Sequence, residues 1–280
     1  MGILNATPDS FSDGRGEEPE AVRVARGRAL IAAGADIVDI GGESARGDRP
    51  AVPAEEEIER VSGLIRVLSR EVVVSVDTYK PEVAEAAIAA GATIVNDVSG
   101  LRDPELAAVC ARGGAALVLM HTRAAPKETV LDPETYEDVV ADVVAFLRER
   151  SELARSAGVS ELILDPGPDF AKTPAQTVEV LRHLDAVRAL GYPLLLAISR
   201  KDFLGAITGR PPAERDPATL AAVAFAAEAG AAIVRVHDVA GAADFLAVRA
   251  VLRGERVLGP LEGLTPERYP AGVPDHLTLG

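Results

Sequence analysis

Cysteine is nearly absent from this sequence, and so are long apolar runs. Cys110 is the only cysteine in the chain, so neither an intramolecular disulfide nor a cysteine-based metal site can be built from it. No stretch of about 18 apolar residues occurs, and the first residues do not form a basic region followed by an apolar run. The sequence therefore predicts a protein of the reducing cytoplasm, with neither secretion nor membrane insertion.

Positive charge is scarce as well. The 280 residues include 29 Lys and Arg against 43 Asp and Glu, and no local run of basic residues occurs. This balance argues against a nucleic-acid partner bound through a basic face. An anionic substrate must then be held by a few well-placed cations. Lysine is rare, so each lysine within a motif carries weight; the lysines are Lys80, Lys127, Lys172 and Lys201.

Eight short apolar segments rich in Val, Ile and Leu recur along the chain. Each is long enough for a β-strand and too short for a helix. Between them, Ala, Leu and Val recur three and four residues apart amid Glu and Arg, as at 57–68 and 135–157, which is typical of amphipathic helices. The predicted strands span 1–6, 36–41, 72–78, 92–97, 115–121, 160–166, 193–199 and 231–237.

Glycine marks the join between most predicted helices and the strand that follows. Only glycine adopts the left-handed conformation at a helix C-terminus at low cost. Apolar strands that alternate with helices indicate a parallel sheet, and eight units indicate closure, so we expect an α/β fold, a single (β/α)8 TIM barrel over residues 1–280. A doubly wound open sheet is the alternative. The joins are at Gly34, Gly91, Gly114, Gly158, Gly191 and Gly230.

Polar and charged residues stand where the predicted strands end. In such a barrel the active site is assembled at the carboxyl ends of the strands. A single Asp, Asn or Ser after a strand is more often the N-cap of the next helix. Here, however, all eight strands end in polar residues, whereas the opposite ends of the strands follow plain glycine–alanine turns. This asymmetry favours one functional face. The residues are Asn5, Asp39, Asp77, Asn96, Asp97, His121, Asp165, Ser199, Arg200, Lys201, Arg235 and His237.

The side-chain types at these ends suit a flat, amino-substituted heterocycle joined to an anionic group. Asp77, Asn96 and Asp165 can donate and accept hydrogen bonds along the edge of such a ring. Positive charge and a neutral oxygen, which suit a phosphate-bearing group with a divalent metal, come from Lys201, Arg235, His237 and Asn5.

Two other site chemistries find less support. A zinc hydrolase usually has two histidines at ligand spacing on one element, and no such pair occurs. A nucleophilic serine is disfavoured because Ser199 lacks the glycine-flanked turn of a nucleophile elbow.

Eight motifs resemble, in order along the chain, those of the dihydropteroate synthase family, and they cover essentially the whole chain. They are MGILNATPDSFSDG at 1–14, DIGGES at 39–44, SVDTYK at 75–80, NDVSG at 96–100, MH at 120–121, DPG at 165–167, SRK at 199–201 and RVHDV at 235–239. Members of this family are transferases of folate biosynthesis. They condense 6-hydroxymethyl-7,8-dihydropterin pyrophosphate with p-aminobenzoate, forming 7,8-dihydropteroate and pyrophosphate. The resemblance implies this activity here.

The resemblance also implies roles for individual residues. Asp77, Asn96, Asp165 and Lys201 would hold the pterin, and Arg235 would stack over its ring. With His237 and Asn5, Arg235 would also bind the pyrophosphate and its Mg2+, for which Asn5 is the predicted protein ligand. The implied catalytic residues are Asp77, Lys201 and Arg235.

Two loops, at 6–16 and 42–50, would close over the site and build the p-aminobenzoate pocket. The pyrophosphate would leave first, so a carbocation on the pterin methylene would need the Asp77 anion and the exclusion of water. Further substrate-binding residues implied by the resemblance are Pro8, Phe11, Arg46, Phe170 and Ser199.

Several positions depart from the family pattern. The second loop reads Ser-Ala-Arg-Gly-Asp at 44–48 where the family has Ser-Thr-Arg-Pro-Gly, so we expect weaker competition by sulfonamides. Residues 168–172 read Pro-Asp-Phe-Ala-Lys where the family has Gly-Phe-Gly-Lys, and Ala197 replaces a glycine. Asp169 and Ala197 are expected to add bulk near the pterin plane.

Two alternatives remain beside the synthase. A non-catalytic pterin-binding paralogue is supported only by the changes at Ala45, Gly47, Asp169 and Ala197. A methyltetrahydrofolate-dependent methyltransferase domain would lack the loop at 7–14 and the SRK triplet. The resemblance further implies a homodimer, to which the alanine-rich helix at 219–228 could contribute, although that helix could equally be buried against the barrel.

Overall fold

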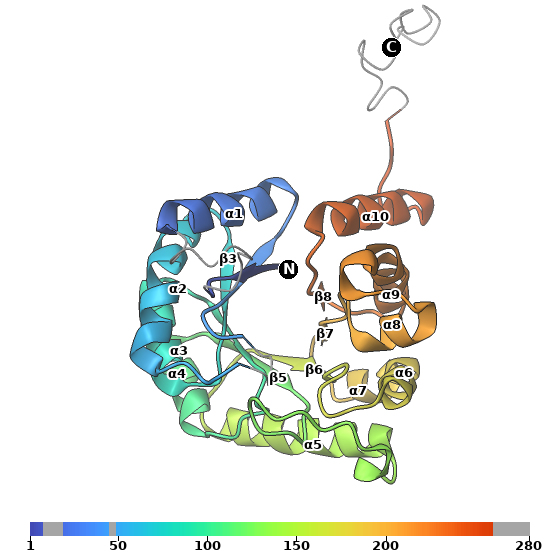
Figure 1. Ribbon diagram of the computed structural model, residues 1–280, viewed down its shortest axis with the longest axis horizontal. Helices are drawn as coiled ribbons and strands as arrows, with labels where there is room; N and C mark the ends of the chain where they lie inside the picture. Colours follow the sequence, from blue (N-terminus) through green and yellow to red (C-terminus); the bar gives the residue numbers. More distant parts are fainter. Residues whose placement is uncertain (8–18, 45–48, 260–280) are drawn as a thin grey trace, which may run out of the picture. The chain divides into compact units, whose positions relative to one another are not determined.

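Eight parallel strands alternate with helices in the computed structural model, which describes residues 1–7, 19–44 and 49–259 (Figure 1). Each strand lies within a segment predicted to contain one, although β7 and β8 have only two residues each. The strands in the described residues are β1 (Gly2–Asn5), β2 (Ile37–Gly41), β3 (Val73–Asp77), β4 (Ile94–Asp97), β5 (Ala116–Met120), β6 (Leu162–Asp165), β7 (Leu195–Leu196) and β8 (Ile233–Val234).

The strands close into a ring. β1 to β6 form one sheet in sequential order and β7 pairs with β8. Parallel bridges Leu164↔Leu194 and Gly2↔Val236 join the two sheets at both seams. At the second seam the Val236 amide donates to the carbonyl oxygen of Met1 at 3.0 Å. The predicted (β/α)8 barrel is thereby confirmed over the open-sheet alternative.

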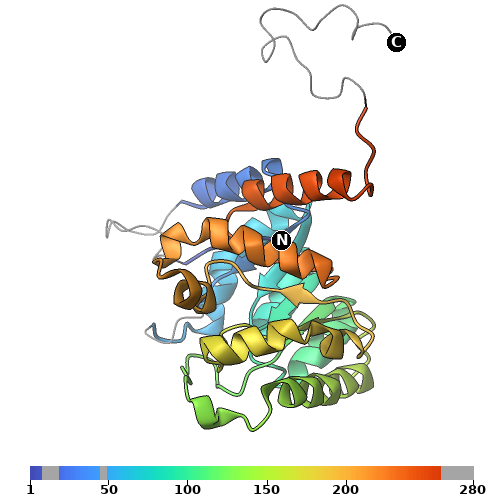
Figure 2. The ribbon, with the colours of Figure 1, turned by 90° about the vertical axis from the view of Figure 1, so that its right-hand side faces the viewer.

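Helices follow the strands and, from α1 to α9, lie outside the ring (Figure 1); Figure 2 shows it from the side of α6, α8 and α9. The helix predicted at 135–157 begins later, at Val139, because the Asp138 side chain accepts hydrogen bonds from two first-turn amides. The helices are α1 (Glu20–Ala32), α2 (Ala54–Leu68), α3 (Pro81–Ala90), α4 (Glu105–Gly113), α5 (Val139–Ser156), α6 (Pro174–Arg182), α7 (Leu184–Arg188), α8 (Asp202–Thr208), α9 (Asp216–Glu228) and α10 (Val239–Leu252).

Alternation along the strands divides the barrel interior into an apolar part and a polar part. The buried apolar cluster consists of Met1, Ile94, Val118, Ile163, Leu195 and Ala197. Two residues further along β4 and β6 stand Asn96 and Asp165, on the same face of each strand. The register pairs Asp77 with Asn96 and Met120 with Asp165, so these polar residues end up at one rim. Ala197 belongs to the apolar cluster rather than to a polar surface.

Two compact units make up the chain, Met1–Ala242 and Ala243–Gly280. The first contains all eight strands named above. Within the second, Arg253 and Arg249 pair with Glu255 at 2.8 and 3.4 Å. Among the described helices, none combines the length and the apolarity needed to cross a membrane.

Candidate active site

Arg235 joins two acidic strand ends inside the barrel. Its Nε donates to Asp39 Oδ2 at 2.6 Å and its Nη2 donates to Asp77 Oδ2 at 2.7 Å. Asn96 Nδ2 donates to the same Asp39 oxygen at 3.2 Å. The side chains that follow β8 therefore meet those of β2, β3 and β4 at one place.

This cluster contains more negative charge than Arg235 offsets. Burial raises the pKa of Asp77 to about 7; Arg235 opposes that rise, whereas Asp39 adds to it. Asp39 Oδ1 is buried and has no hydrogen-bond partner in the described part of the chain. A bound group with N–H donors, or one that develops positive charge, would be stabilised here.

Asp165 is the last residue of β6, and Lys201 follows β7 and directly precedes α8. Asp165 is buried, and its Oδ1 accepts a hydrogen bond from the Gly167 amide at 2.8 Å. Burial raises the pKa of Asp165 to about 6, against the opposing effect of Lys201, Lys172 and Arg235. The Lys201 Nζ lies 4.3 Å from the centroid of the Phe170 ring. Asp165, Lys201 and Arg235 thus interact electrostatically at one rim.

Ser199 and His237 form a second polar pair at this rim. The His237 amide donates to Ser199 Oγ at 3.2 Å, and His237 Nδ1 lies 2.9 Å from the same oxygen. If the hydroxyl donates to Nδ1, the exposed imidazole carries its proton on Nε2 and presents a donor to solvent. Such a donor suits an anionic group at the mouth of the barrel.

A match to a family model described as "Pterin binding enzyme" covers residues 1–237. The chain belongs to this family. It is 43% identical over 259 residues to the dihydropteroate synthase of Streptococcus pyogenes serotype M3. The alignment covers 90% of this chain and 94% of that protein. A solved structure of Xanthomonas albilineans dihydropteroate synthase with 4-aminobenzoic acid shares 44% identity and a TM-score of 0.84, with 90% of this chain and 92% of that chain covered.

A longer relative from Haloferax volcanii is a probable bifunctional folylpolyglutamate synthase/dihydropteroate synthase. It is 45% identical over 242 residues, which are 85% of this chain. Those residues span only 29% of the Haloferax protein, so the chain corresponds to a part of it.

Sequence reasoning missed a hydrogen-bonded chain of side chains that links the loop after β6, the residue after β5 and α5. Lys172 Nζ donates to the carbonyl oxygens of Gly167 and Phe170 at 3.0 and 3.1 Å and lies 2.8 Å from His121 Nδ1. His121 Nε2 lies 2.9 Å from Asp142 Oδ1. Burial lowers the pKa of Lys172 to about 7, yet its three protons have three acceptors. The rarity of lysine was the signal that could have identified Lys172.

Glu43 organises the side of the site near the second predicted loop. Its Oε2 accepts hydrogen bonds from Lys80 Nζ at 2.7 Å and from the Val52 amide at 2.8 Å. Its Oε1 lies 3.2 Å from Lys127 Nζ, which also donates to the carbonyl oxygen of Ser44. A cavity of about 400 Å³ opens here, and its lining includes Glu43, Tyr79, Lys127, Phe170 and Asp202. The backbones of Ser44 and Val52 are therefore both held by hydrogen bonds to charged side chains.

Not every predicted site residue can be placed. Pro8, Phe11 and Arg46 lie outside the described residues, as do the substituted positions Ala45 and Gly47. Asn5 is exposed at the end of β1 and pairs in register with Gly41, which in turn pairs with Asp77. Asn5 therefore shares the rim with the Arg235 cluster.

Asp169, which is expected to add bulk near the pterin plane, uses its carboxylate to contact two helices. Asp169 Oδ2 accepts hydrogen bonds from the amides of Asp202 and Phe203, and Oδ1 accepts one from the Thr177 hydroxyl. The added side chain is thus used in contacts with α6 and α8.

Proposed function

We infer that this protein is a transferase that acts as a dihydropteroate synthase, condensing 6-hydroxymethyl-7,8-dihydropterin pyrophosphate with p-aminobenzoate. The inference rests on the hydrogen-bonded cluster of Arg235, Asp39, Asp77 and Asn96. The cluster lies at the strand ends of a barrel that belongs to the pterin-binding family. Its relatives at 43% and 44% identity carry the dihydropteroate synthase name.

In this proposal the pterin lies between the two halves of the rim. Asp77, Asn96 and Asp165 bind its polar edge, Lys201 donates to it, and Arg235 stacks over the ring. When pyrophosphate departs, positive charge develops on the pterin methylene. Asp77 faces that charge; burial raises the pKa of Asp77, and a cation formed beside it would favour its anionic form.

The pyrophosphate and Mg2+ would lie at the mouth of the barrel. The described residues contain no group of three or more His, Cys, Asp or Glu arranged around a metal ion. Asn5, exposed at the end of β1, offers one amide oxygen to such an ion, and water and the substrate phosphates would supply its other ligands, as is usual for Mg2+. Bound there, Mg2+ would offset the charge of the leaving group, and His237 and Arg235 would bind that group as donors.

The p-aminobenzoate pocket would be built by the two loops together with residues near Lys201. Phe170 contacts Lys201 through its ring, and Ser199 lies two residues before Lys201 in the chain, which supports a place for both beside the pocket. The remaining members proposed for this pocket are Pro8, Phe11 and Arg46. Closure of the loops would exclude water until the amine arrives.

The proposal is tested by pyrophosphate release from purified protein with Mg2+. Release is expected only when both substrates are present, and Lys201→Ala and Asp77→Asn should each lower kcat by about 100-fold or more, the effect of losing one prepositioned electrostatic group. Asp185→Asn, on the exposed surface of α7, is the control and should retain full turnover. Pterin binding without any dihydropteroate would instead identify the non-catalytic paralogue.

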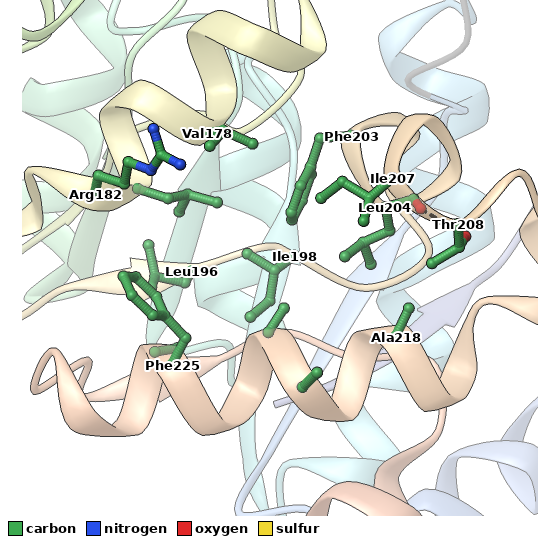
Figure 3. Close-up of a pocket in the computed structure, with 14 residues that line it drawn as sticks. Val178, Arg182, Leu196, Ile198, Phe203, Leu204, Ile207, Thr208, Ala218 and Phe225 are labelled. Atoms are coloured by element: carbon green, nitrogen blue, oxygen red, sulfur yellow. Dashed lines mark hydrogen bonds between the residues drawn. The ribbon is translucent and has the colours of Figure 1, made fainter.

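We also propose a cytoplasmic homodimer whose residues 1–280 form one pterin-binding barrel domain. An apolar groove of about 380 Å³ lies between α6, α8 and α9; Phe203, Leu204 and Ile207 line one end of it, and Phe225 lies beside Leu196 at the other (Figure 3). Ile207 and Phe225 are 68% and 45% exposed, whereas Val223 and Ala226 of the same α9 are buried. Since α9 packs on the barrel with one side and leaves Phe225 open, a second copy of the chain is the proposed partner.

A further inference from the structure

Asp169 ties the loop after β6 to two helices. Its Oδ2 accepts hydrogen bonds from the amides of Asp202, at 2.5 Å, and Phe203, at 3.3 Å. Its Oδ1 accepts a hydrogen bond from the Thr177 hydroxyl at 3.0 Å. Asp202 and Phe203 are the first two residues of α8, and Thr177 lies in α6. One carboxylate therefore fixes the loop against both helices.

The two amides at the start of α8 have no acceptor within the helix. The first amides of any α-helix lack such partners, and Lys201, which precedes α8, provides no side-chain cap. A carboxylate 33 residues earlier in the chain supplies the missing acceptor, and its negative charge suits the partial positive charge of a helix N-terminus. Asp169 therefore sets where α8 begins, and with it the backbone position of Lys201.

The backbone of Asp169 adopts an unusual conformation in this arrangement. Its φ of 63° lies in the left-handed region, which Asp and Asn tolerate better than other non-glycine residues. The Asp169 amide donates to Thr177 Oγ1 at 3.0 Å, which holds the turn. The next residue is Phe170, whose ring faces Lys201. The same turn thus presents an aromatic ring to Lys201 and places a carboxylate on the amide of the next residue, Asp202.

Lys201 depends on nearby anions because it is largely enclosed. Burial lowers the pKa of Lys201, and Asp169 opposes this more than any other group, ahead of Asp165. Two cations also lower the pKa of Lys201, namely Arg235 after β8 and Lys172 in the loop after β6. The exposed Asp202 of α8 raises this pKa weakly. Asp202 is itself paired with Arg215 at 3.0 Å.

We propose that Asp169 is a positioning residue for Lys201, capping α8 directly after Lys201 and serving as the counter-charge of its ammonium group. The proposal rests on the function proposed above, in which a protonated Lys201 binds the pterin. In this proposal the loop after β6 contributes to the reaction although Asp169 itself need not contact the substrate.

Two substitutions separate the cap from the charge. Asp169→Asn keeps a carbonyl oxygen for the α8 amides and tolerates the left-handed backbone, but it removes the charge. Asp169→Ala removes both. Because the chain has four lysines, protein labelled with 13C at lysine Cε gives few signals, and Lys201→Arg identifies the signal of Lys201. The titration of Lys201 can then be followed by NMR without substrate.

In Asp169→Asn the pKa of Lys201 should fall, because an anion that opposes the effect of burial is removed, and the alkaline limb of kcat/KM for the pterin substrate should move to lower pH with it. Asp169→Ala should in addition lower the Tm, and Asp185→Asn should change neither quantity. An unchanged Lys201 titration in Asp169→Asn would overturn the counter-charge, and an unchanged Tm in Asp169→Ala would overturn the cap. Wild-type protein without condensation activity would count against the proposed function alone, since the NMR titration needs no catalysis.

Discussion

Two carboxylates share one guanidinium at the centre of this barrel. Arg235 binds Asp39 and Asp77 at 2.6 and 2.7 Å, so when both carboxylates are ionised one of the two negative charges lacks a full counter-charge. A charge that is buried and incompletely paired lowers stability, and such residues are typical of sites that bind a charged or polar ligand. The residues proposed to bind substrate therefore carry a cost in stability.

Asp77→Asn should show this cost directly. The pKa of Asp77 is about 7 in the folded protein against an ordinary value of 3.8, so the folded state binds this proton more tightly than the unfolded state. Its contribution to stability is fully present below pH 3.8 and is lost as the pH rises through about 7. At pH 8 the variant should therefore have a higher free energy of unfolding, by up to about 4 kcal/mol for the full pKa difference, with turnover strongly reduced.

Urea unfolding at pH 5 and pH 8 measures the effect. Wild-type protein should lose stability between these two pH values, partly through Asp165, whose pKa is also raised. The variant should lose less. An identical loss in both proteins would contradict the assignment to Asp77.

At the scale of elements, the start of the helix α6 restrains the loop after β6. α6 begins with a capping box: Thr173 Oγ1 accepts from the Gln176 amide, and Gln176 Oε1 accepts from the Thr173 amide at 2.8 Å. Lys172 precedes this cap and Asp169 lies three residues before Lys172. The start of α6 therefore limits the positions open to the loop that carries Phe170.

Thr173→Ala should lower the free energy of unfolding by about 1 kcal/mol, because it leaves the Gln176 amide without its acceptor. Thr173→Ser, which retains the hydroxyl, is the matched control and should stay close to wild type in urea unfolding. Equal destabilisation by both variants would attribute the loss to the Thr173 methyl group instead of the cap.

Sequence patterns located these elements well but not their ends. Each predicted strand segment contains the observed strand, because a parallel strand buried on both faces is apolar throughout. The start of α5 was misplaced, since Asp138 caps it in a stretch whose apolar spacing already resembles a helix. β7 ends at Leu196 instead of Ser199, because hydrogen bonding to a neighbouring strand, which the sequence does not record, defines where a strand ends.

At the scale of the whole molecule, formation of the barrel does not by itself explain the exposed apolar groove between α6, α8 and α9. A monomer would leave Ile207 and Phe225 in water, whereas a second copy could cover them. Apolar contact of this kind contributes to association in proportion to the area removed from water.

The double substitution Ile207→Asp with Phe225→Asp should convert a dimer into a monomer while the fold is retained. Light scattering coupled to gel filtration measures the mass, and circular dichroism monitors the fold. Val22→Asp provides the control, because Val22 is an exposed apolar residue of α1 outside the groove. A wild-type protein that runs as a monomer, or a double variant that remains dimeric, would refute the proposed interface.

The sequence by itself determined the barrel and the residue types at its strand ends, because periodicity and strand ends are local properties of the chain. Only the tertiary structure decided how those residues are paired. Arg235 reaches Asp39 across 196 positions, Lys172 reaches His121 across 51, and Asp169 reaches α8 across 33. Such contacts depend on strand register and loop conformation, which bring distant segments within hydrogen-bonding distance only once the ring has closed.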